Sequence, residues 1–161
     1  MSDANETDGA RRAREALEAS GIEHTVARYG RANSLAESAA LRGLEPRDII
    51  KTLVVRRGSG DYLFVLVPGD REISWPKLRE HLGVSRLSMP PADKAKDATG
   101  YERGTITPFG STTAWPVIAD ATVPGRTISM GAGEHGVGAT AAADDIIRAL
   151  DAEVVDVTDP A

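Results

Sequence analysis

Two apolar runs separated by a short polar turn constrain the fold of this chain most strongly. Residues 49–55 and 62–67 are rich in Val, Ile and Leu, and Arg-Arg-Gly-Ser-Gly-Asp stands between them. Runs of this length and composition predict buried β-strands. A glycine-containing polar connection predicts that the two strands pair as a hairpin. Because such a hairpin is apolar on both faces, other parts of the chain must cover it.

The rest of the chain alternates short helical and short strand patterns. Helices are predicted behind capping residues, and strands are predicted where β-branched residues cluster between turns. The predicted helices cover residues 11–20, 34–43, 74–82, 90–98 and 143–150. The further strands cover residues 24–29, 87–89, 115–119, 127–130, 137–141 and 153–157. This order is neither strict βαβ alternation nor an all-strand sandwich, so it indicates a mixed α/β sheet.

Composition limits the classes of protein to consider. With 161 residues, we expect one domain over residues 10–161 after a polar, acidic and flexible tail at residues 1–9. The chain has no cysteine, which excludes disulfides, thiolate metal sites and a thiol nucleophile. No apolar run approaches the roughly 18 residues of a membrane helix. The N-terminus also lacks the apolar core of a signal peptide, so we expect a cytoplasmic protein with no membrane partner.

The charge balance argues against a general coat for nucleic acid. The net charge is −5, whereas non-specific binding depends on neutralising phosphates with Lys and Arg. Aromatic residues make up 4% of the chain, which is too few for a wide base-stacking platform. The charge balance does not exclude a small, local contact with phosphate.

One lysine stands inside a strand that should be buried. Lys51 interrupts the run Ile-Ile-Lys-Thr-Leu-Val-Val, in a chain with 15 arginines among its 19 basic residues. A lysine at such a position either extends its ammonium to solvent or loses hydration, and desolvated lysines are candidate functional groups. The alternative is a lysine at a strand end or edge that points into water.

Two glycine-rich segments are further candidates. Residues 131–136 match G-x-G-x-x-G, but a poor helix start follows, and we expect no dinucleotide site. This segment is either a tight structural turn or a turn whose N–H groups hold an anion. Residues 100–110 contain three glycines and Pro108, which predict a rigid loop that either connects elements or positions a ligand.

Histidine and carboxylate patterns offer little catalytic machinery. His24, His81 and His135 lack metal-ligand spacing, so we expect neither a metal nor a cofactor. His135 lies in the second glycine segment, where it is either a general base or a solvated loop residue. Asp144 and Asp145 stand at a helix start, where carboxylates favour the helix dipole. No G-x-S-x-G or Walker A motif occurs.

Three blocks occur in the order and at the separations of one known family. They are Ile50-Lys51-Thr52-Leu53-Val54, Gly100-Tyr101-x-x-Gly104-x-Ile106-x-Pro108-Phe109-Gly110, and Gly131-x-Gly133-x-x-Gly136 followed by Ala143-Asp144-Asp145-Ile146-Ile147. Together they resemble the YbaK and prolyl-tRNA-synthetase editing domains, which are free-standing or inserted aminoacyl-tRNA deacylases. The resemblance covers about residues 12–158.

This resemblance implies a curled, mainly antiparallel mixed sheet with flanking helices and a small pocket for the 3′ end of a mischarged tRNA. The implied reaction is hydrolysis of the aminoacyl ester, with tRNAPro carrying a small wrong amino acid as substrate and prolyl-tRNA synthetase as a candidate partner. Lys51 matches the family's essential lysine, which this resemblance places to hold either the terminal phosphate–ribose end or the acyl group. The other residues that the resemblance places at the aminoacyl end are Tyr29, Pro108, Gly110, Ala132 and Gly133.

The implied chemistry agrees with the residues present. An activated ester needs orientation, a cation and main-chain donors near the developing oxyanion, so no Ser-His-Asp triad is required. Three departures matter: cysteine-specific members carry an acidic residue where this chain has Gly138 and an aromatic residue near Ser34, and Glu134-His135 replaces a basic pair. The alternatives are a module of the same fold that binds a tRNA end or a synthetase without hydrolysis, and a hydrolase for a small ester or amide.

Overall fold

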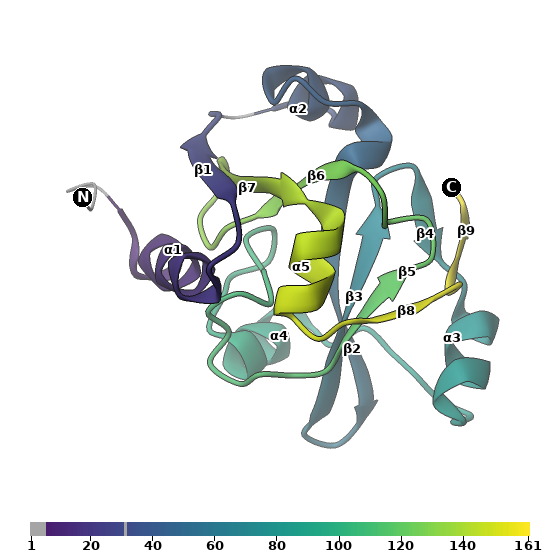
Figure 1. Ribbon diagram of the computed structural model, residues 1–161. Helices are drawn as coiled ribbons and strands as arrows, with labels where there is room; N and C mark the ends of the chain where they lie inside the picture. Colours follow the sequence, from purple (N-terminus) through teal and green to yellow (C-terminus); the bar gives the residue numbers. More distant parts are fainter. Residues whose placement is uncertain (1–5, 31) are drawn as a thin grey trace.

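The computed structural model describes residues 6–30 and 32–161, and its centre is a seven-stranded mixed sheet in the order β1-β7-β6-β2-β3-β5-β8. In the middle of the sheet, β2 (Ile49–Gly58) and β3 (Asp61–Pro68) pair antiparallel. This confirms the expected hairpin, although both strands run further toward the turn than the apolar runs indicated. Figure 1 shows the pair passing through the middle of the molecule.

The strands on one side of this hairpin pair mainly antiparallel, and those on the other side pair parallel. On one side, β1 (His24–Arg28) pairs antiparallel with β7 (Val137–Ala142), and β7 pairs antiparallel with β6 (Thr127–Gly131). Parallel pairs join β6 to β2, β3 to β5 (Val117–Asp120), and β5 to β8 (Glu153–Val155). The antiparallel registers are the longer ones, so the predicted mixed and mainly antiparallel α/β class is confirmed.

A second, two-stranded sheet lies near the C-terminus and was not predicted. It pairs β4 (Arg71–Ile73) antiparallel with β9 (Thr158–Pro160). Strands of three residues are too short to show the alternation that reveals a strand in sequence. The single strand predicted at residues 153–157 therefore overlaps β8 but misses β9. The strand predicted at residues 87–89 is wrong in extent, because only a single bridge between Arg56 and Ser88 forms there.

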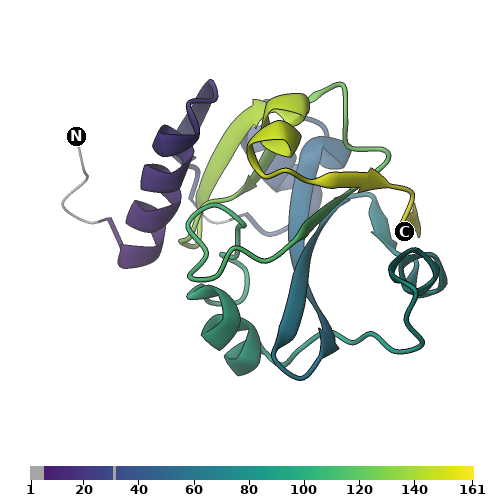
Figure 2. The ribbon, with the colours of Figure 1, turned by 60° about the horizontal axis from the view of Figure 1, so that its bottom comes forward.

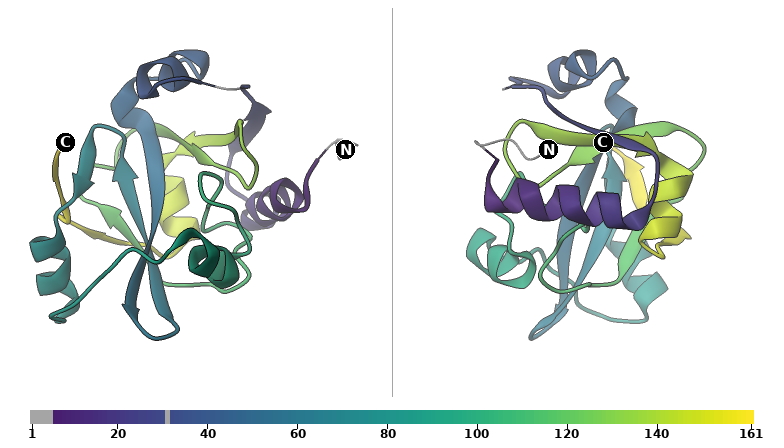
Figure 3. Two further views of the ribbon diagram at one scale, coloured as in Figure 1. Left: turned by 180° about the vertical axis from the view of Figure 1, so that it is seen from behind. Right: turned by 60° about the vertical axis from the view of Figure 1, so that its left-hand side comes forward.

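Five α-helices flank the sheet within the described residues. They are α1 (Asp8–Ser20), α2 (Leu35–Leu41), α3 (Trp75–Leu82), α4 (Ala92–Thr99) and α5 (Ala143–Ala149), with a 3-10 turn at Pro46–Asp48. Figures 2 and 3 show α1 and α3 on opposite sides of the sheet. None of these helices is long and apolar enough to cross a membrane.

The first helix starts earlier than the sequence indicated. Thr7 caps α1 by accepting a hydrogen bond from the N–H of Ala10, so Asp8 and Gly9 of the expected tail are helical. Glu6 is also placed, through an ion pair with Arg14. The remaining tail residues, 1–5, lie outside the described part of the chain. The N-terminal segment therefore packs onto the domain from residue 6 onward.

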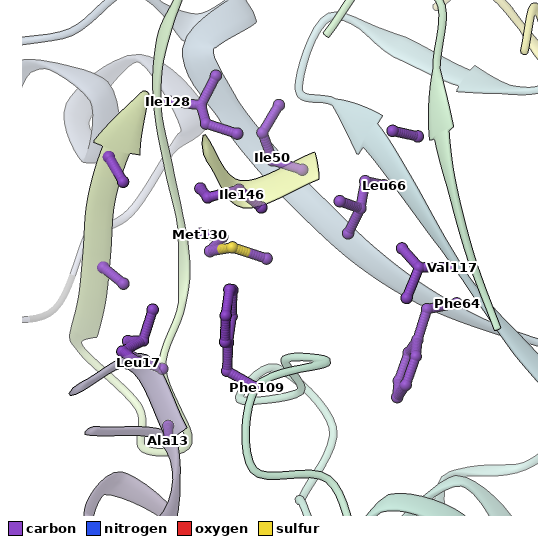
Figure 4. Packing of buried hydrophobic residues seen from close by; sticks show 14 of the residues in the cluster. Ala13, Leu17, Ile50, Phe64, Leu66, Phe109, Val117, Ile128, Met130 and Ile146 are labelled. Carbon is purple, nitrogen blue, oxygen red and sulfur yellow. The ribbon is translucent and has the colours of Figure 1, made fainter. Parts of the chain in front are cut away.

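The sheet separates two apolar clusters. Ile50 of β2 belongs to the larger cluster, which also holds Met130 of β6 and Phe109 of the loop 100–110. Val55 of β2 belongs to the smaller cluster with Leu78 of α3. Figure 4 shows Phe109 pointing from its loop toward Met130. Because alternate strand residues face opposite sides of a sheet, even-numbered β2 residues face the larger cluster and odd-numbered ones face the smaller.

Candidate active site

A cavity of about 590 Å³ lies where β2 and β6 separate. The two strands pair only at Ile49 and Ile50, and the next pairing on that edge of β2 is the bridge at Arg56. Residues 51–54 between these points line the cavity. Its other walls come from residues 89–95, 103–106 and 131–137, together with Arg42. Parts of all three sequence blocks therefore meet at one cavity.

The unpaired edge of β2 presents main-chain hydrogen-bonding groups. Arg56 exchanges two hydrogen bonds with Ser88, of 2.7 and 3.1 Å, on the side of β2 away from β3. Thr52 and Val54 have the same parity as Arg56, so their N–H and C=O groups also point away from β3. Within the described residues, no strand pairs with them. The cavity wall therefore offers both donors and acceptors to a ligand.

Lys51 lies in this wall and is anchored at its tip. The side chain is half-buried, and its Nζ donates a hydrogen bond to the main-chain oxygen of Arg71 at 2.7 Å. Lys51 is therefore neither a fully desolvated lysine nor one that points freely into water, the two possibilities that the sequence left open. An ammonium group has three N–H donors, so the contact with Arg71 leaves two of them without a protein partner among the described residues.

The glycine segment 131–136 is held by its own main chain. The N–H of Ala132 donates to the oxygen of Val137 at 3.2 Å, and that of Gly133 donates to the oxygen of Thr105 at 3.0 Å. At Gly133, φ is +87° and an added Cβ would lie 2.2 Å from the oxygen of Gly9. These contacts favour the structural-turn interpretation at Ala132 and Gly133, because neither N–H is available to an anion. The residues of the segment that line the cavity are instead Gly131, Glu134 and Gly136.

The loop 100–110 contributes its middle rather than its end to the cavity. Gly104 and Ile106 line the cavity beside Lys51. Pro108 lines a different cavity of about 600 Å³ near β5. Gly110 packs against α1, where its main-chain oxygen accepts a hydrogen bond from Arg12 Nε at 3.2 Å. The structure therefore does not bring the predicted residues Pro108 and Gly110 to the wall that contains Lys51.

A second cavity, of about 720 Å³, adjoins the first and contains the predicted residue Tyr29. Arg42 and Gly136 line both cavities. The N–H of Tyr29 donates to the oxygen of Gly136 at 2.8 Å, which fixes the residue beside the glycine segment. Tyr29 therefore lies next to the cavity of Lys51 rather than inside it.

Arg42 is the functional candidate that the sequence analysis missed. It caps the C-terminus of α2, and its Cζ lies 4.9 Å from the centroid of the Tyr29 ring, a cation–π distance. Its Nη1 donates to Ser129 Oγ at 2.7 Å. Burial lowers the pKa of the Arg42 guanidinium, which nevertheless stays protonated at neutral pH as arginines do. One signal for it existed: Ser129 is a polar residue in an apolar strand pattern.

Glu134 is a carboxylate of the cavity wall whose two oxygens are both engaged. Oε1 accepts a hydrogen bond from the N–H of Thr7 at 3.1 Å, and Oε2 pairs with Arg28. The hydrogen bond from Arg28 is the main cause that lowers the pKa of Glu134. The neighbouring His135 is 70% exposed, which favours the solvated-loop interpretation over that of a general base. Glu134 therefore anchors the N-terminal segment rather than acting as a base.

Known proteins are similar to this chain in sequence and in fold. The family model of the aminoacyl-tRNA editing domain matches residues 30–149. A proline–tRNA ligase of Trichlorobacter lovleyi is 31% identical over 132 residues, which are 79% of this chain and 23% of the ligase. A proline–tRNA ligase of Geobacter sp. strain M21 is 32% identical over 92 residues, which are 57% of this chain and 16% of the ligase. The chain thus spans less than a quarter of the length of these relatives.

A solved structure extends the likeness to the whole fold. It is a candidate trans-editing enzyme for prolyl-tRNA synthetase, with a TM-score of 0.87, 24% identity, and coverage of 95% of this chain and 98% of that one. The match of the family model spans most of the chain and includes both Lys51 and the glycine segment. On these grounds, the chain belongs to the aminoacyl-tRNA editing domain family.

Proposed function

We propose that this protein is a deacylase that acts in trans and hydrolyses the ester bond of a mischarged aminoacyl-tRNA. One observation carries the proposal: Lys51, an unpaired strand edge and the glycine segment form the walls of a single cavity of about 590 Å³. That volume is in the usual range for small-molecule sites. In a member of the editing family, such a cavity is a suitable binding site for an aminoacyl group on a terminal ribose.

The cavity offers groups that match the charge changes of ester hydrolysis. Water attacks the ester carbonyl carbon, the bond from that carbon to the ribose oxygen breaks, and a proton passes to the ribose oxygen. The developing oxyanion needs preorganised donors, and two N–H groups of Lys51 and the main-chain N–H groups of Thr52 and Val54 are candidates. The main-chain oxygens of the same strand edge can accept hydrogen bonds from the α-ammonium of the aminoacyl group.

The proton that leaves the attacking water needs an acceptor. Glu134 is the only carboxylate that lines the cavity among the described residues, and both of its oxygens are engaged. No histidine of that part of the chain lines the cavity. The vicinal ribose hydroxyl or a side chain of the aminoacyl group is then the proton relay, so catalysis rests on orientation and electrostatic stabilisation.

The proposed substrate is tRNAPro that carries a small wrong amino acid, and a prolyl-tRNA synthetase is the candidate partner. The similarity to proline–tRNA ligases supports this assignment. Apolar side chains such as Ile50, Val54 and Ile106 limit the space for the acyl group. A pocket of limited size acts as a second sieve that admits small residues and rejects the cognate one. We expect the reaction to take place in the cytoplasm, where tRNA is charged.

A deacylation panel tests the proposal. The purified protein is mixed with tRNAPro charged with alanine, serine, cysteine or proline, and with alanine on its own tRNA. We expect rapid hydrolysis of one mischarged tRNAPro, while Pro-tRNAPro is spared. Absence of hydrolysis across all of these substrates would contradict the proposed activity. Inhibition by uncharged tRNA separates this enzyme from a hydrolase for small esters, which should be insensitive to it.

A binding module of the same fold is the second candidate. One observation favours it: the tip of Lys51 is already hydrogen-bonded to Arg71 rather than free in the cavity. In that case, the protein would bind a tRNA end or a synthetase tightly and hydrolyse no aminoacyl-tRNA. Binding measurements on the same preparations that are used in the panel decide between the two.

A further inference from the structure

Arg42 carries a positive charge that has no counter-ion in the described part of the chain. No ion pair among those residues includes its guanidinium, and its Nε is buried without a hydrogen-bond partner. Buried polar groups in folded proteins are almost always hydrogen-bonded, and an exception calls for an explanation. A half-buried cation with an unpaired N–H donor is the pattern expected of a residue that binds an anion.

The guanidinium is held in place before any ligand arrives. Tyr29 lies under its face, and Ser129 accepts one of its N–H groups. Space for it exists because Gly138 has no side chain: a Cβ there would lie 2.7 Å from Arg42 Nη1. These three contacts come from Tyr29, which follows β1, from Ser129 of β6 and from Gly138 of β7, and they leave Nε and Nη2 without a protein partner among the described residues. Preorganisation of this kind favours bidentate binding of phosphate or carboxylate.

The place of Arg42 indicates which anion fits. Arg42 lines both the cavity of Lys51 and the adjoining cavity of Tyr29. An ester whose acyl group lies among the apolar residues near Lys51 can extend its ribose and the next phosphodiester past this junction. The glycine segment does not replace Arg42 there, because the N–H groups of Ala132 and Gly133 are already engaged.

We propose that Arg42 binds the phosphodiester that links the terminal adenosine to the rest of the tRNA acceptor end, and that this contact positions the ester beside Lys51. The inference rests on the proposed function and names a subsite of the same cavity. The rival source of an anion is a carboxylate on the acyl group itself. The phosphodiester is favoured because Arg42 lies at the junction of the two cavities, whereas the wall around Ile50 and Ile106 is apolar.

Kinetics on two substrates test the inference. One substrate is the aminoacyl-tRNA, and the other is the same amino acid esterified to adenosine, which has no phosphodiester. For Arg42→Gln, we expect kcat/KM on the tRNA substrate to fall about ten- to a hundredfold, mainly through KM, as for loss of a charge-assisted hydrogen bond. Cleavage of the adenosine ester should change less than about twofold. Equal losses on both substrates, or no loss on either, would overturn the inference.

A matched control removes the same charge elsewhere. Arg148 is 71% exposed on α5 and lines neither cavity. Arg148→Gln should leave both substrates unaffected. Gly138→Ala is a second test variant, because its methyl group displaces the guanidinium without removing it. It should reproduce the selective loss on the tRNA substrate if Arg42→Gln proves unstable in a thermal unfolding measurement.

A binding measurement that involves no catalysis distinguishes failure of this inference from failure of the proposed function. The trinucleotide CCA and adenosine are titrated into the wild-type protein and into Arg42→Gln by NMR. We expect weaker CCA binding for the variant, with a salt slope lower by about 0.7, and unchanged adenosine binding. If the wild type binds CCA through Arg42 but hydrolyses nothing, the deacylase proposal fails and the subsite stands. If the wild type deacylates but binds CCA no more tightly than Arg42→Gln does, only the proposed phosphodiester subsite is contradicted.

A further experiment distinguishes a phosphodiester from an acyl carboxylate as the anion that Arg42 binds. Adenosine esters of aspartate and alanine are compared on the wild type and on Arg42→Gln. The phosphodiester assignment predicts that the substitution affects neither ester. A selective loss on the aspartyl ester, with CCA binding intact, would instead assign Arg42 to an acyl carboxylate and contradict our inference.

Discussion

The ammonium of Lys51 donates a hydrogen bond to the main-chain oxygen of Arg71, 20 residues away, at 2.7 Å. Arg71 is itself held by the C-terminal strand, because its Nε donates to Thr158 Oγ1 at 2.7 Å and its Nη2 donates to the main-chain oxygen of Thr158 at 3.3 Å. The position of the candidate catalytic lysine therefore depends on the small sheet of β4 and β9, outside the cavity. We expect this coupling to orient Lys51.

The first prediction concerns this coupling. Thr158→Val removes the buried hydroxyl that accepts from Arg71, so we expect Arg71 to shift and Lys51 to be less well oriented. kcat for deacylation should fall several-fold with little change in KM, and the free energy of unfolding should fall by about 1 kcal/mol. Thr127→Val, at an exposed position of β6, is the control. Unchanged kcat in Thr158→Val would show that β9 does not position Lys51.

A second prediction concerns the contact between α1 and the glycine segment. Gly133→Ala places a Cβ 2.2 Å from the oxygen of Gly9 at a φ of +87°, whereas Gly125→Ala meets no atom within 4 Å at a φ of +86°. Both substitutions carry the strain of a positive φ, about 1–2 kcal/mol. Only Gly133→Ala adds a collision with main chain. Urea unfolding should therefore show a clearly larger loss for Gly133→Ala, and equal losses would contradict the close approach of α1.

A third prediction concerns the pH dependence of stability. Burial raises the pKa of Asp120, but hydrogen bonds from Thr122 and from the N–H of Val157 outweigh burial and lower this pKa overall. The ionised carboxylate therefore stabilises the fold above about pH 4, the unfolded-state pKa of aspartate, and this stability is lost as the pH falls through the lower, folded-state pKa.

Asp120→Asn tests this linkage. The amide keeps the shape but cannot ionise, so the free energy of unfolding at pH 7 should fall by about 1–3 kcal/mol. The difference from the wild type should shrink as the pH is lowered toward about 3. Asp97→Asn, at an exposed position of α4, should show no such trend. A difference for Asp120→Asn that stays constant over this range would argue against the ionised carboxylate as the source of the stability.

The parts of the fold that follow from local pattern were predictable. The hairpin of β2 and β3 has two long apolar runs and a short turn, so its strands are specified within 20 residues of sequence. The helices have local caps, such as Ser34, whose Oγ accepts from the N–H of Glu37 at 3.0 Å. By contrast, β4 and β9 have three residues each and lie far apart in sequence, so no local pattern indicates their pairing.

The candidate site was predictable in outline but not in detail. Lys51 stood out because a charged residue interrupts an apolar strand, and the structure places it in the cavity wall. Arg42 did not stand out, because its contact with Ser129 spans 87 residues and its space depends on a glycine in β7. Pro108 lies away from the cavity because the end of its loop folds back toward α1 and β5. Apart from Ser129, a polar residue in an apolar strand pattern, these long-range contacts have no signal in the local sequence.

The most direct test of the account compares Lys51→Ala with the wild type on the mischarged tRNAPro that the wild type hydrolyses fastest. Lys96→Ala, at an exposed position paired with Glu102, is the control for loss of a lysine. If the account is right, Lys51→Ala loses at least about a hundredfold in kcat while its thermal unfolding stays that of a folded protein, and Lys96→Ala retains full activity. Normal turnover by folded Lys51→Ala would contradict the assignment of Lys51 as the catalytic cation.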